Sequence, residues 1–291
     1  GFSGGKDSTM LLQIVWYSLL KIEPSLRTRP IYVISNDTLV ENPKIVKYVE
    51  KVLHQIQKSA TEQSLPIEVV KTKPRLEDTF WVNLIGKGYP APNSNIFRWC
   101  TDRLKINPTS RFIKSIVKNG DEAIILLGTR SEESVKRARS IKKHEIKGKR
   151  LRKHLLNNVF VYAPIKDITT NEVWKYLMIV SSPWNADNED LVRLYKNANH
   201  GDCPLVIDKT TPSCGHSRFG CWVCTVVKRD KSMESLVENG EEWMLPLLKY
   251  RDELSNSRYD RDKRENRRRI NRKLTIPPEE EEWGAYTLEY R

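Results

Sequence analysis

Apolar and polar positions follow two recurring patterns along residues 1–165. Short apolar runs bounded by turn residues predict buried strands at 31–34, 66–71 and 122–127. Between them, apolar residues spaced three or four positions apart predict helices at 10–20, 43–64, 76–84 and 108–118. Because strands that alternate with helices form parallel sheets, we predict a doubly wound, mostly parallel α/β sheet with helices on both faces.

The pattern changes after residue 165. Thr169 and Glu172 have the spacing of a capping box, which predicts the start of a helix, and 187–196 predicts a second helix. Residues 200–230 are irregular, whereas 233–254 and the basic segment after it are predicted to be helical. We therefore expect a less regular region behind the α/β part of the chain.

Three parts of the chain follow from these patterns. They are an α/β domain at 1–165, a helical and cysteine-rich region at 166–235, and a basic helical segment with a tail at 236–291. With 291 residues, of which 38% are hydrophobic, the chain can form a packed core. No apolar run reaches the ~18 residues that span a bilayer and no export leader is visible, so we expect a cytoplasmic protein without a membrane partner.

A glycine pair stands directly before the first predicted helix, where residues 3–8 read S-G-G-K-D-S. Contiguous glycines let the backbone approach an anion closely, and Lys6 adds positive charge. Asp7 beside bound phosphates can orient Mg²⁺, and neither Lys6 nor Asp7 would be needed if Ser8 only capped the helix. The segment differs from the common P-loop, which has four residues between its glycines. We expect a buried strand to precede this loop, and hence residue 1.

Positive charge is high and unevenly distributed. The net charge of +13 and the pI near 9.4 favour a polyanionic partner. A first basic run is predicted to be a mobile loop at 142–154 that contacts nucleic acid, through Lys142, Lys143, Lys147, Lys149, Arg150, Arg152 and Lys153. A second run at 258–273 is diluted by acidic residues and is equally typical of a solvated helix face. DNA is the partner we expect.

Four of the five cysteines lie in the irregular, glycine-punctuated stretch. They are Cys203, Cys214, Cys221 and Cys224. An odd number of cysteines without a secretion signal argues against disulfides. Four thiolates suit a structural zinc or an iron–sulfur cluster, and the spacing alone does not choose between them. Either metal centre would offset the conformational entropy that is lost when such a segment becomes ordered.

Five segments resemble family motifs, in the same order. Residues 3–8 resemble the S-G-G-x-D-S motif of ATP pyrophosphatases, which cleave ATP between its α and β phosphates. Residues 37–43, 98–105, 128–134 and 220–225 resemble motifs of adenylylsulfate and phosphoadenylylsulfate reductases. The resemblance implies an adenine nucleotide alpha hydrolase-like fold. It also implies an ATP site that includes Ser3, Gly4, Gly5, Lys6, Asp7, Ser8, Asp37, Gly128, Arg130 and Arg137.

The chain departs from the reductases at two cysteine positions. Cluster-carrying adenylylsulfate reductases have a cysteine doublet where this chain has Trp99 and Cys100, and no cysteine follows Cys224 as a late redox thiol. The basic runs, Lys6 and the additional cysteines instead resemble the sulfurtransferase subunits of the Dnd DNA phosphorothioation systems. That resemblance implies ATP pyrophosphatase activity, a cysteine desulfurase as sulfur donor and other Dnd subunits as partners. It further implies a 4Fe-4S cluster, for which we assign Cys203, Cys214, Cys221 and Cys224.

Replacing a phosphate oxygen of DNA with sulfur requires activation, because that oxygen is a very poor leaving group unless adenylylation lets it leave with AMP. We expect Lys6 and Asp7 to serve that step and Cys100 to deliver sulfur, since Arg98 and Arg103 would favour its thiolate. Alternatively, Cys100 is a cluster ligand. Two other functions remain open, a sulfonucleotide reductase and a zinc-stabilised DNA-binding protein without catalysis.

Overall fold

The computed structural model describes residues 1–93, 98–117, 121–144, 146, 150–198, 220–266, 268–270, 273–275 and 284–291. The chain divides into two compact units. The first unit comprises Gly1–Asn36, Pro43–Thr72 and Thr109–Phe219. The second comprises Asp37–Asn42, Lys73–Pro108 and Gly220–Arg291. Each unit thus gathers segments that are distant in sequence, whereas the sequence-based division used three contiguous ranges.

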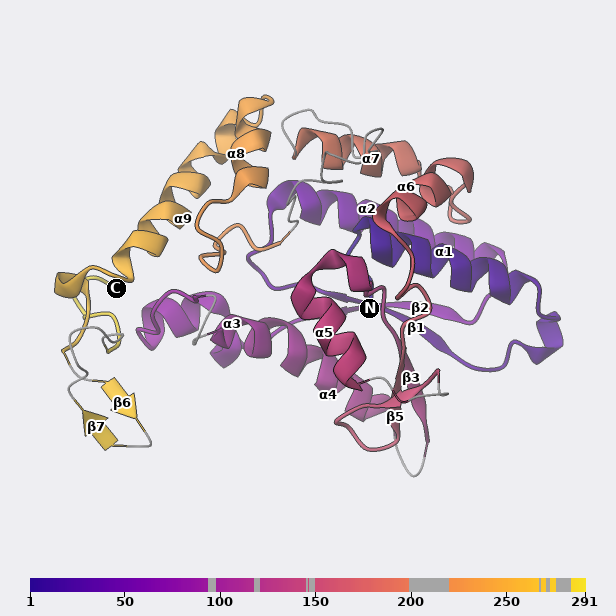
Figure 1. Ribbon diagram of the computed structural model, residues 1–291, viewed down its shortest axis with the longest axis horizontal. Helices are drawn as coiled ribbons and strands as arrows, with labels where there is room; N and C mark the ends of the chain where they lie inside the picture. Colours follow the sequence, from indigo (N-terminus) through magenta and orange to yellow (C-terminus); the bar gives the residue numbers. More distant parts are fainter. Residues whose placement is uncertain are drawn as a thin grey trace. The chain divides into compact units, whose positions relative to one another are not determined.

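Strands of the first unit are mostly parallel, as predicted (Figure 1). They are β1 (Ile31–Asn36), β2 (Ile67–Thr72), β3 (Ala123–Leu126), β4 (Arg152–Lys153) and β5 (Val159–Tyr162). β1 pairs with β2 in parallel, with Ile31 opposite Ile67, and β3 pairs with β5 in parallel. Among these described strands, β4 alone is antiparallel to its neighbour, β5.

Residues 1 and 2 lie between these two groups of strands. The backbone nitrogen of Phe2 donates to the carbonyl of Ile34 in β1 at 2.7 Å. The nitrogen of Gly1 donates to the carbonyl of Leu126 in β3 at 3.4 Å. The chain therefore enters the glycine loop at the carboxyl ends of parallel strands, which is where open α/β sheets bind ligands.

Helices cover both faces of the β1–β2 pair. The helices of the first unit are α1 (Lys6–Leu20), α2 (Pro43–Glu62), most of α4 (Asn107–Ile116), α5 (Val135–His144), α6 (Thr170–Ile179) and α7 (Asn188–Asn197). Trp16 of α1 and Ile56 of α2 pack with Val33 of β1 in one buried core. On the opposite face, the ring of Tyr32 meets Phe112 of α4 edge to face at 5.3 Å. Successive side chains of a strand point to opposite faces, so these contacts confirm the two-sided arrangement.

Local sequence signals explain where these helices start. Pro43 occupies the first position of α2, where a proline costs no hydrogen bond. At α6 the predicted capping box is present, because the hydroxyl of Thr169 accepts from the backbone of Glu172 at 3.2 Å and the carboxylate of Glu172 accepts from the backbone of Thr169 at 2.7 Å. Asp187 caps α7 in a similar way.

The second unit contains shorter elements. They are η2 (Leu76–Asp78), η3 (Val82–Gly86), α3 (Trp99–Thr101), η4 (Asp102–Ile106), α8 (Lys231–Glu238), η6 (Glu242–Met244), α9 (Leu245–Ser257), η7 (Arg261–Lys263), β6 (Arg268–Ile270) and β7 (Lys273–Thr275). Phe80, Leu104 and Val223 lie in its core together with Leu254 of α9. No helix among the described residues of either unit is long and apolar enough to cross a membrane.

Three predicted elements are wrong in detail. The helix predicted at 76–84 is a 3-10 turn and a π turn, because the buried amide of Asn83 donates to the carbonyls of Glu77 and Thr79. The strand predicted as buried at 122–127 is partly exposed, with 55% of Ile124 accessible. The helix predicted at 233–254 breaks into α8 and α9 at Gly240, whose φ of 101° a helix does not allow.

Both basic runs also differ from their predicted conformations. Lys142 and Lys143 lie on α5, and β4 is formed by Arg152 and Lys153, so the first run is not one continuous loop. The second run contains η7 and the antiparallel hairpin of β6 and β7 instead of a helix. Its Arg264 is buried and donates to the carbonyl of Gly284 at 2.8 Å, a structural contact that charge counting does not reveal.

Candidate functional site

Glycine is required at two places, one in the loop before α1 and one in the segment after β3. Gly4 has a φ of 74°, and a Cβ there would lie 2.6 Å from Cγ2 of Val49. Gly128 follows β3, and a Cβ there would lie 3.0 Å from the carbonyl oxygen of Asp7. A side chain at either position would therefore collide with its surroundings, which explains how the loop can approach both α2 and the segment after β3.

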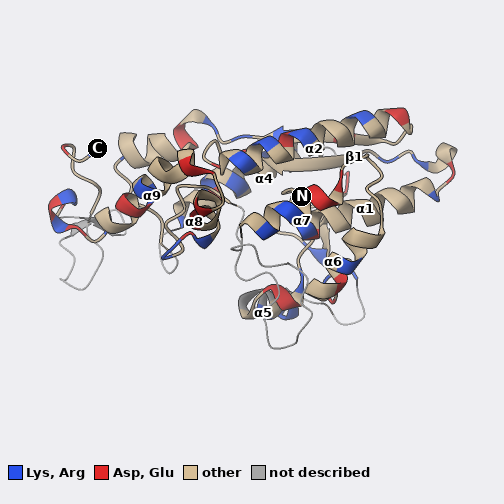
Figure 2. Ribbon diagram, turned by 90° about the horizontal axis from the view of Figure 1, so that it is seen from above, with Lys and Arg blue, Asp and Glu red and all other residues tan. Residues whose placement is uncertain are grey.

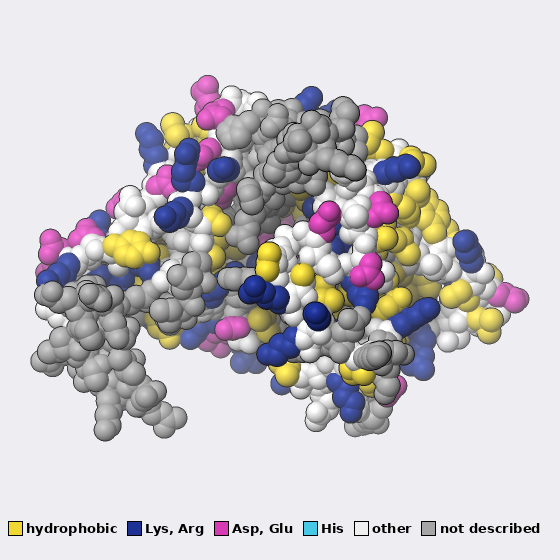
Figure 3. All heavy atoms as spheres, viewed as in Figure 1, with side chains coloured by type: hydrophobic (Ala, Val, Ile, Leu, Met, Phe, Trp, Pro, Cys, Tyr) yellow, Lys and Arg dark blue, Asp and Glu magenta, His cyan; other side chains and the backbone are white. Residues whose placement is uncertain are grey.

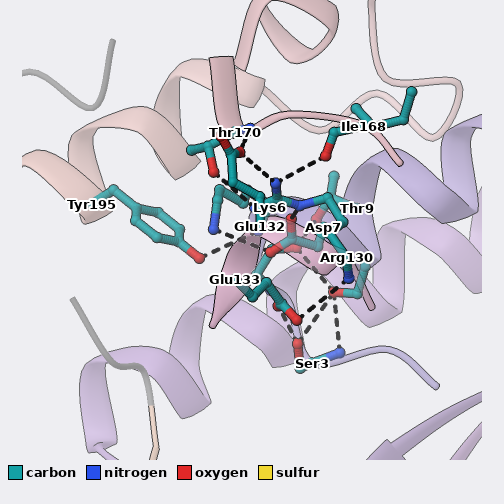
Figure 4. Close-up of polar contacts among 12 residues, drawn as sticks. Ser3, Lys6, Asp7, Thr9, Arg130, Glu132, Glu133, Ile168, Thr170 and Tyr195 are labelled. Carbon is teal, nitrogen blue, oxygen red and sulfur yellow. Dashed lines mark hydrogen bonds and ion pairs between the residues drawn. The ribbon is translucent and has the colours of Figure 1, made fainter. Parts of the chain in front are cut away.

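Hydroxyl groups fix the shape of this loop (Figure 4). The hydroxyl of Ser8 donates to the carbonyl of Gly5 at 2.9 Å and accepts from the backbone nitrogen of Ser3 at 3.3 Å. Thr9 also donates to the carbonyl of Gly5, at 3.0 Å. Since α1 begins at Lys6 without a side-chain cap, its first backbone N–H groups stay directed out of the helix end.

A cavity of about 230 Å³ opens at this helix end. Backbone and hydroxyl groups line much of it, together with Tyr195, Asp7 and Glu133. Thr129 is also in its lining, and the hydroxyl oxygen of Thr129 is buried and has no hydrogen-bond partner among the described residues. Buried polar atoms are usually satisfied, so an oxygen-rich ligand is the expected partner of Thr129. Helix N-termini attract anions, and the cavity therefore suits a phosphate group.

Asp7 is held between two cations. Its carboxylate oxygens lie 3.1 Å from Nζ of Lys6 and 2.5 Å from Nε of Arg130. Because each oxygen already faces a cation, this arrangement does not offer Asp7 as a Mg²⁺ ligand, and we derive no step through that metal. The predicted role of Asp7 in placing Mg²⁺ stays a prediction.

Arg130 is 1% exposed and contacts four groups of the protein (Figure 4). They are the carboxylates of Asp7 and Glu132, the carbonyl of Ile168 at 3.1 Å, and the hydroxyl of Thr170 at 3.0 Å. Those acceptors occupy four of the five N–H groups of a guanidinium. Arg130 therefore ties the loop after β3 to α1 and α6. Its predicted direct contact with phosphate stays a prediction.

Sequence reasoning did not find Tyr195. Its hydroxyl accepts from the backbone nitrogen of Lys6 at 3.4 Å, and the Lys6 ammonium lies 5.5 Å from the ring centroid. The only sequence signal was the buried face of α7, on which Leu191 and Tyr195 are four residues apart. That spacing indicates burial and gives no information about a contact with residue 6.

Three cysteines of the second unit are close to one another. Cys100, Cys221 and Cys224 are free thiols, and the charge of Cys224 affects the pKa of each of the other two. Cys221 lies 3.3 Å from the hydroxyl of Thr38, and burial raises its pKa to about 11. The fold thus brings Cys100 to the pair at 221 and 224, from more than a hundred positions away in sequence.

The expectation that Cys100 is readily ionised is wrong. Burial raises the pKa of its thiol, and the charge of Cys224 adds to that effect. Arg98 opposes the shift only weakly, while Arg103 is 3.3 Å from the carboxylate of Asp78. The arginines adjacent in sequence therefore do not compensate for the loss of water around the sulfur.

A partly exposed ion pair lies beside these thiols. The ammonium of Lys105 is 3.5 Å from the carboxylate of Glu41. Loss of water around Lys105 lowers the pKa of its ammonium. The negative charges of Cys221 and Glu41 raise that pKa by a larger amount in total, so the net shift is upward. Asp37 belongs to this unit as well. Its carboxylate accepts from the backbone of Leu39 at 3.0 Å and pairs with Lys73 at 3.6 Å.

Several predicted site residues lie outside the described residues. They are Cys203, Cys214, Lys147, Lys149 and the side chain of Arg137. Among the residues that are described, no three histidine, cysteine or acidic side chains are placed to hold one metal ion. Of the four cysteines predicted to hold a metal, the structure describes Cys221 and Cys224. Two thiols are not sufficient for a metal centre, and we derive no step through a cluster.

Basic side chains of the first unit reach the surface in several places. Lys142 and Lys143 on α5 are exposed, and so are Arg150 and Lys153. Figure 3 shows Lys and Arg side chains grouped around the part of the surface where α5 lies. Figure 2 shows that α2 and α4 also carry basic residues, so positive charge is not confined to the first basic run.

Comparison with known proteins gives one family. The family model for the phosphoadenosine phosphosulfate reductase domain matches residues 1–227. Among solved structures, the chain is similar to the phosphate complex of a phosphoadenylyl-sulfate reductase from Candida auris, at 14% identity and a TM-score of 0.35. That similarity covers 60% of this chain and 68% of the other. A comparison with curated protein sequences finds no significant match.

Proposed function

The chain belongs to the phosphoadenosine phosphosulfate reductase domain family, and we propose that it is an ATP-dependent sulfurtransferase that acts on DNA. It would cleave ATP between the α and β phosphates, activate a DNA backbone phosphate by adenylylation, and help to replace a non-bridging oxygen with sulfur. The observation that carries this proposal is the cavity at the start of α1. It is lined by the loop that leads into α1 without a side-chain N-cap and by Thr129, whose buried hydroxyl has no hydrogen-bond partner among the described residues.

The geometry of that cavity supports phosphate binding. Backbone N–H groups at a helix N-terminus and the ammonium of Lys6 both favour negative charge. Lys6 is paired with Asp7 at 3.1 Å, and it would exchange this carboxylate for the phosphates of ATP. Arg130 keeps Asp7 in place during that exchange, because it remains bonded to α6 through Thr170. The positive charge of the Lys6 ammonium can then stabilise the departing pyrophosphate.

Sulfur transfer needs a nucleophile and a second thiol. A persulfide on one cysteine attacks the adenylylated phosphorus, and the oxygen leaves with AMP. A thiol reductant then attacks the cysteine sulfur of the resulting Cys–S–S–P linkage, which forms a disulfide between that cysteine and the reductant and releases the phosphorothioate. Cys100 is the described free thiol outside the proposed cluster ligands, and it would carry the persulfide. The persulfide itself would come from a cysteine desulfurase.

The remaining parts of the proposal concern DNA, partners and metal. The net charge of +13 and the exposed lysines of α5 support a DNA substrate. Other Dnd subunits are proposed partners. A 4Fe-4S cluster on Cys203, Cys214, Cys221 and Cys224 is also proposed, and when bound it would supply a redox-active centre. Cys221 and Cys224 support it as free thiols three positions apart, joined by a hydrogen bond from the nitrogen of Cys224 to the carbonyl of Cys221 at 3.1 Å.

The decisive experiment measures pyrophosphate release from ATP by anaerobically purified protein. Lys6→Met should lower the rate at least a hundredfold, because it removes the charge that faces the phosphates. Lys21→Met is the matched control, since Lys21 follows the other end of α1 and is exposed. A colourless, zinc-containing protein that releases no pyrophosphate would reject the proposal in favour of a DNA-binding protein.

A second candidate function is favoured by the family match itself. The model that matches residues 1–227 describes a phosphoadenosine phosphosulfate reductase domain. A reductase would release sulfite from adenylylsulfate or phosphoadenylylsulfate in the presence of a thiol reductant. Sulfite production without pyrophosphate release from ATP would select this alternative.

A further inference from the structure

We propose that the hydroxyl of Tyr195 is a phosphate-binding contact of the cavity at the start of α1. It accepts a hydrogen bond from the first backbone N–H of α1 and donates its own proton to a phosphate oxygen of the nucleotide. This inference rests on the proposed function, because it assigns Tyr195 to the pyrophosphate part of the same nucleotide site. Tyr195 is neither part of the motif at 3–8 nor one of the site residues predicted from the sequence.

Position is the first argument. The Tyr195 hydroxyl lines the cavity and lies 3.4 Å from the backbone nitrogen of Lys6. A Cβ at Gly5 would be 3.2 Å from the same oxygen, so the loop passes directly beneath it. Figure 4 shows the ring of Tyr195 reaching from its own helix toward this loop. The hydroxyl therefore stands among the groups that an anion in the cavity would meet.

Chemistry is the second argument. A phenolic hydroxyl accepts through its lone pairs and donates its single proton at the same time. An acceptor bond from the N–H of Lys6 polarises the hydroxyl toward stronger donation, since hydrogen bonds in a chain reinforce one another. Tyr195 would in this way extend the positive end of α1 toward the ligand.

Rigidity is the third argument. Tyr195 is 6% exposed and belongs to a core with Met10 and Leu191. Its ring meets Trp174 edge to face at 4.9 Å, which restricts the orientation of the ring plane. A donor held in place loses little conformational freedom when the ligand binds. Such a group contributes to affinity more effectively than a flexible surface side chain would.

Charge in the cavity is consistent with this role. Glu133 lines the same cavity and would repel phosphate if its carboxylate faced the ligand unpaired. Its carboxylate accepts a hydrogen bond of 3.4 Å from the backbone nitrogen of Arg130, a contact that orients the carboxylate without cancelling its charge. The ammonium of Lys6 lies near the Tyr195 ring, 5.5 Å from its centroid. Lys6 and Tyr195 therefore present a cation and a neutral donor side by side.

The test compares Tyr195→Phe with the full-length wild type by calorimetry, using pyrophosphate, ATP and AMP as probes. Loss of one hydrogen bond to a charged group should weaken pyrophosphate and ATP binding about tenfold. AMP binding should change less than twofold, because AMP lacks the phosphates that the loop would hold. Tyr17→Phe is the matched control, since it removes a hydroxyl that donates to the carbonyl of Ser181 at 2.7 Å.

A second variant keeps the test independent of the first. As a single substitution, Gly5→Ala should push the Tyr195 hydroxyl aside and weaken pyrophosphate binding. When it is combined with Tyr195→Phe, it should weaken pyrophosphate binding little beyond the effect of Tyr195→Phe alone. Additive losses, or unchanged or tighter pyrophosphate binding by Tyr195→Phe, would overturn the inference. Wild-type protein that binds neither ATP nor pyrophosphate would overturn the proposed function together with it. Protein that shows the tenfold loss without releasing pyrophosphate from ATP would reject the proposed function alone.

Discussion

The two units both bury an arginine, but for different purposes. In the first unit, Arg130 pairs with two carboxylates, those of Asp7 at 2.5 Å and Glu132 at 3.3 Å. In the second, Arg251 is fully buried and donates mainly to backbone carbonyls, to those of Cys224 and Lys228 at 2.9 Å and to that of Val227. Arg130 orders charges around a cavity, whereas Arg251 orders irregular chain beside two cysteines.

This difference indicates which kinds of side chain hold the functional segments of each unit in place. The loop at 3–8 is short and local, so glycines and hydroxyls shape it, and charge pairs then orient Lys6. The segment after Cys221 has few regular backbone hydrogen bonds, so its carbonyls depend on a distant guanidinium. The first unit is therefore sensitive to loss of charge, and the second to loss of hydrogen-bond donors and to thiol ionisation.

The largest expected effect is on stability in the first unit. Arg130→Met should lower the free energy of unfolding by about 3–5 kcal/mol, because Asp7 and the hydroxyl of Thr170 lose a buried partner. Urea unfolding followed by tryptophan fluorescence measures the change. Arg193→Ala is the control, since Arg193 is 64% exposed and its ion pairs on α7 contribute within about 1 kcal/mol. Equal losses in the two variants would contradict the difference between buried and exposed pairs.

Local patterns in the sequence were sufficient for much of the fold. Regular apolar spacing predicted α2, and the capping box at Thr169 and Glu172 predicted α6. Contiguous glycines and Lys6 predicted a loop suited to phosphate, because the residues that shape it are neighbours in the chain. Where a structure depends on residues within one turn or one strand, the sequence contains the necessary information.

Contacts between distant segments could not be predicted. Arg130 was expected to face phosphate, but the acceptors at Ile168 and Thr170 that bury it come from another element. Tyr195 had no functional signal, and the ionisation of Cys100 was predicted with the wrong sign because burial outweighs neighbouring charges. The sequence shows which charged residues are neighbours along the chain. Burial in the fold determines which partners these residues have and in which direction a pKa shifts.

The second prediction tests the thiols of the second unit. In protein freed of metal by chelation, Cys221 has its pKa raised from 9.0 to about 11, because burial disfavours the thiolate. Its alkylation by iodoacetamide at pH 8 should be about a hundredfold slower than that of an exposed thiol, since two pKa units reduce the thiolate fraction by that factor. Mass spectrometry of timed reactions measures the rates.

The same shift predicts a loss of stability at alkaline pH. The unfolded thiol ionises first, so the contribution of Cys221 is complete below pH 9 and is lost as the pH rises from about 9 to about 11. Cys221→Ser should show a smaller decrease of the unfolding midpoint across that window than the wild type. Rapid alkylation at pH 8, or an identical pH profile in the variant, would contradict burial as the cause.

The smallest expected effect concerns DNA binding by exposed lysines, which are present in both units. Lys142 and Lys143 are exposed on α5 of the first unit, whereas Lys231 and Lys249 are exposed on α8 and α9 of the second. If α5 contacts DNA phosphates, replacing both of its lysines with alanine should weaken duplex binding severalfold. It should also reduce the slope of log affinity against log salt by about 2, because two fewer counterions are released. The double variant at Lys231 and Lys249 has the same net charge, so a loss caused only by the lower total charge would be equal in both. Fluorescence anisotropy at several salt concentrations separates the cases, and equal slopes would show that the DNA-binding role does not belong to α5.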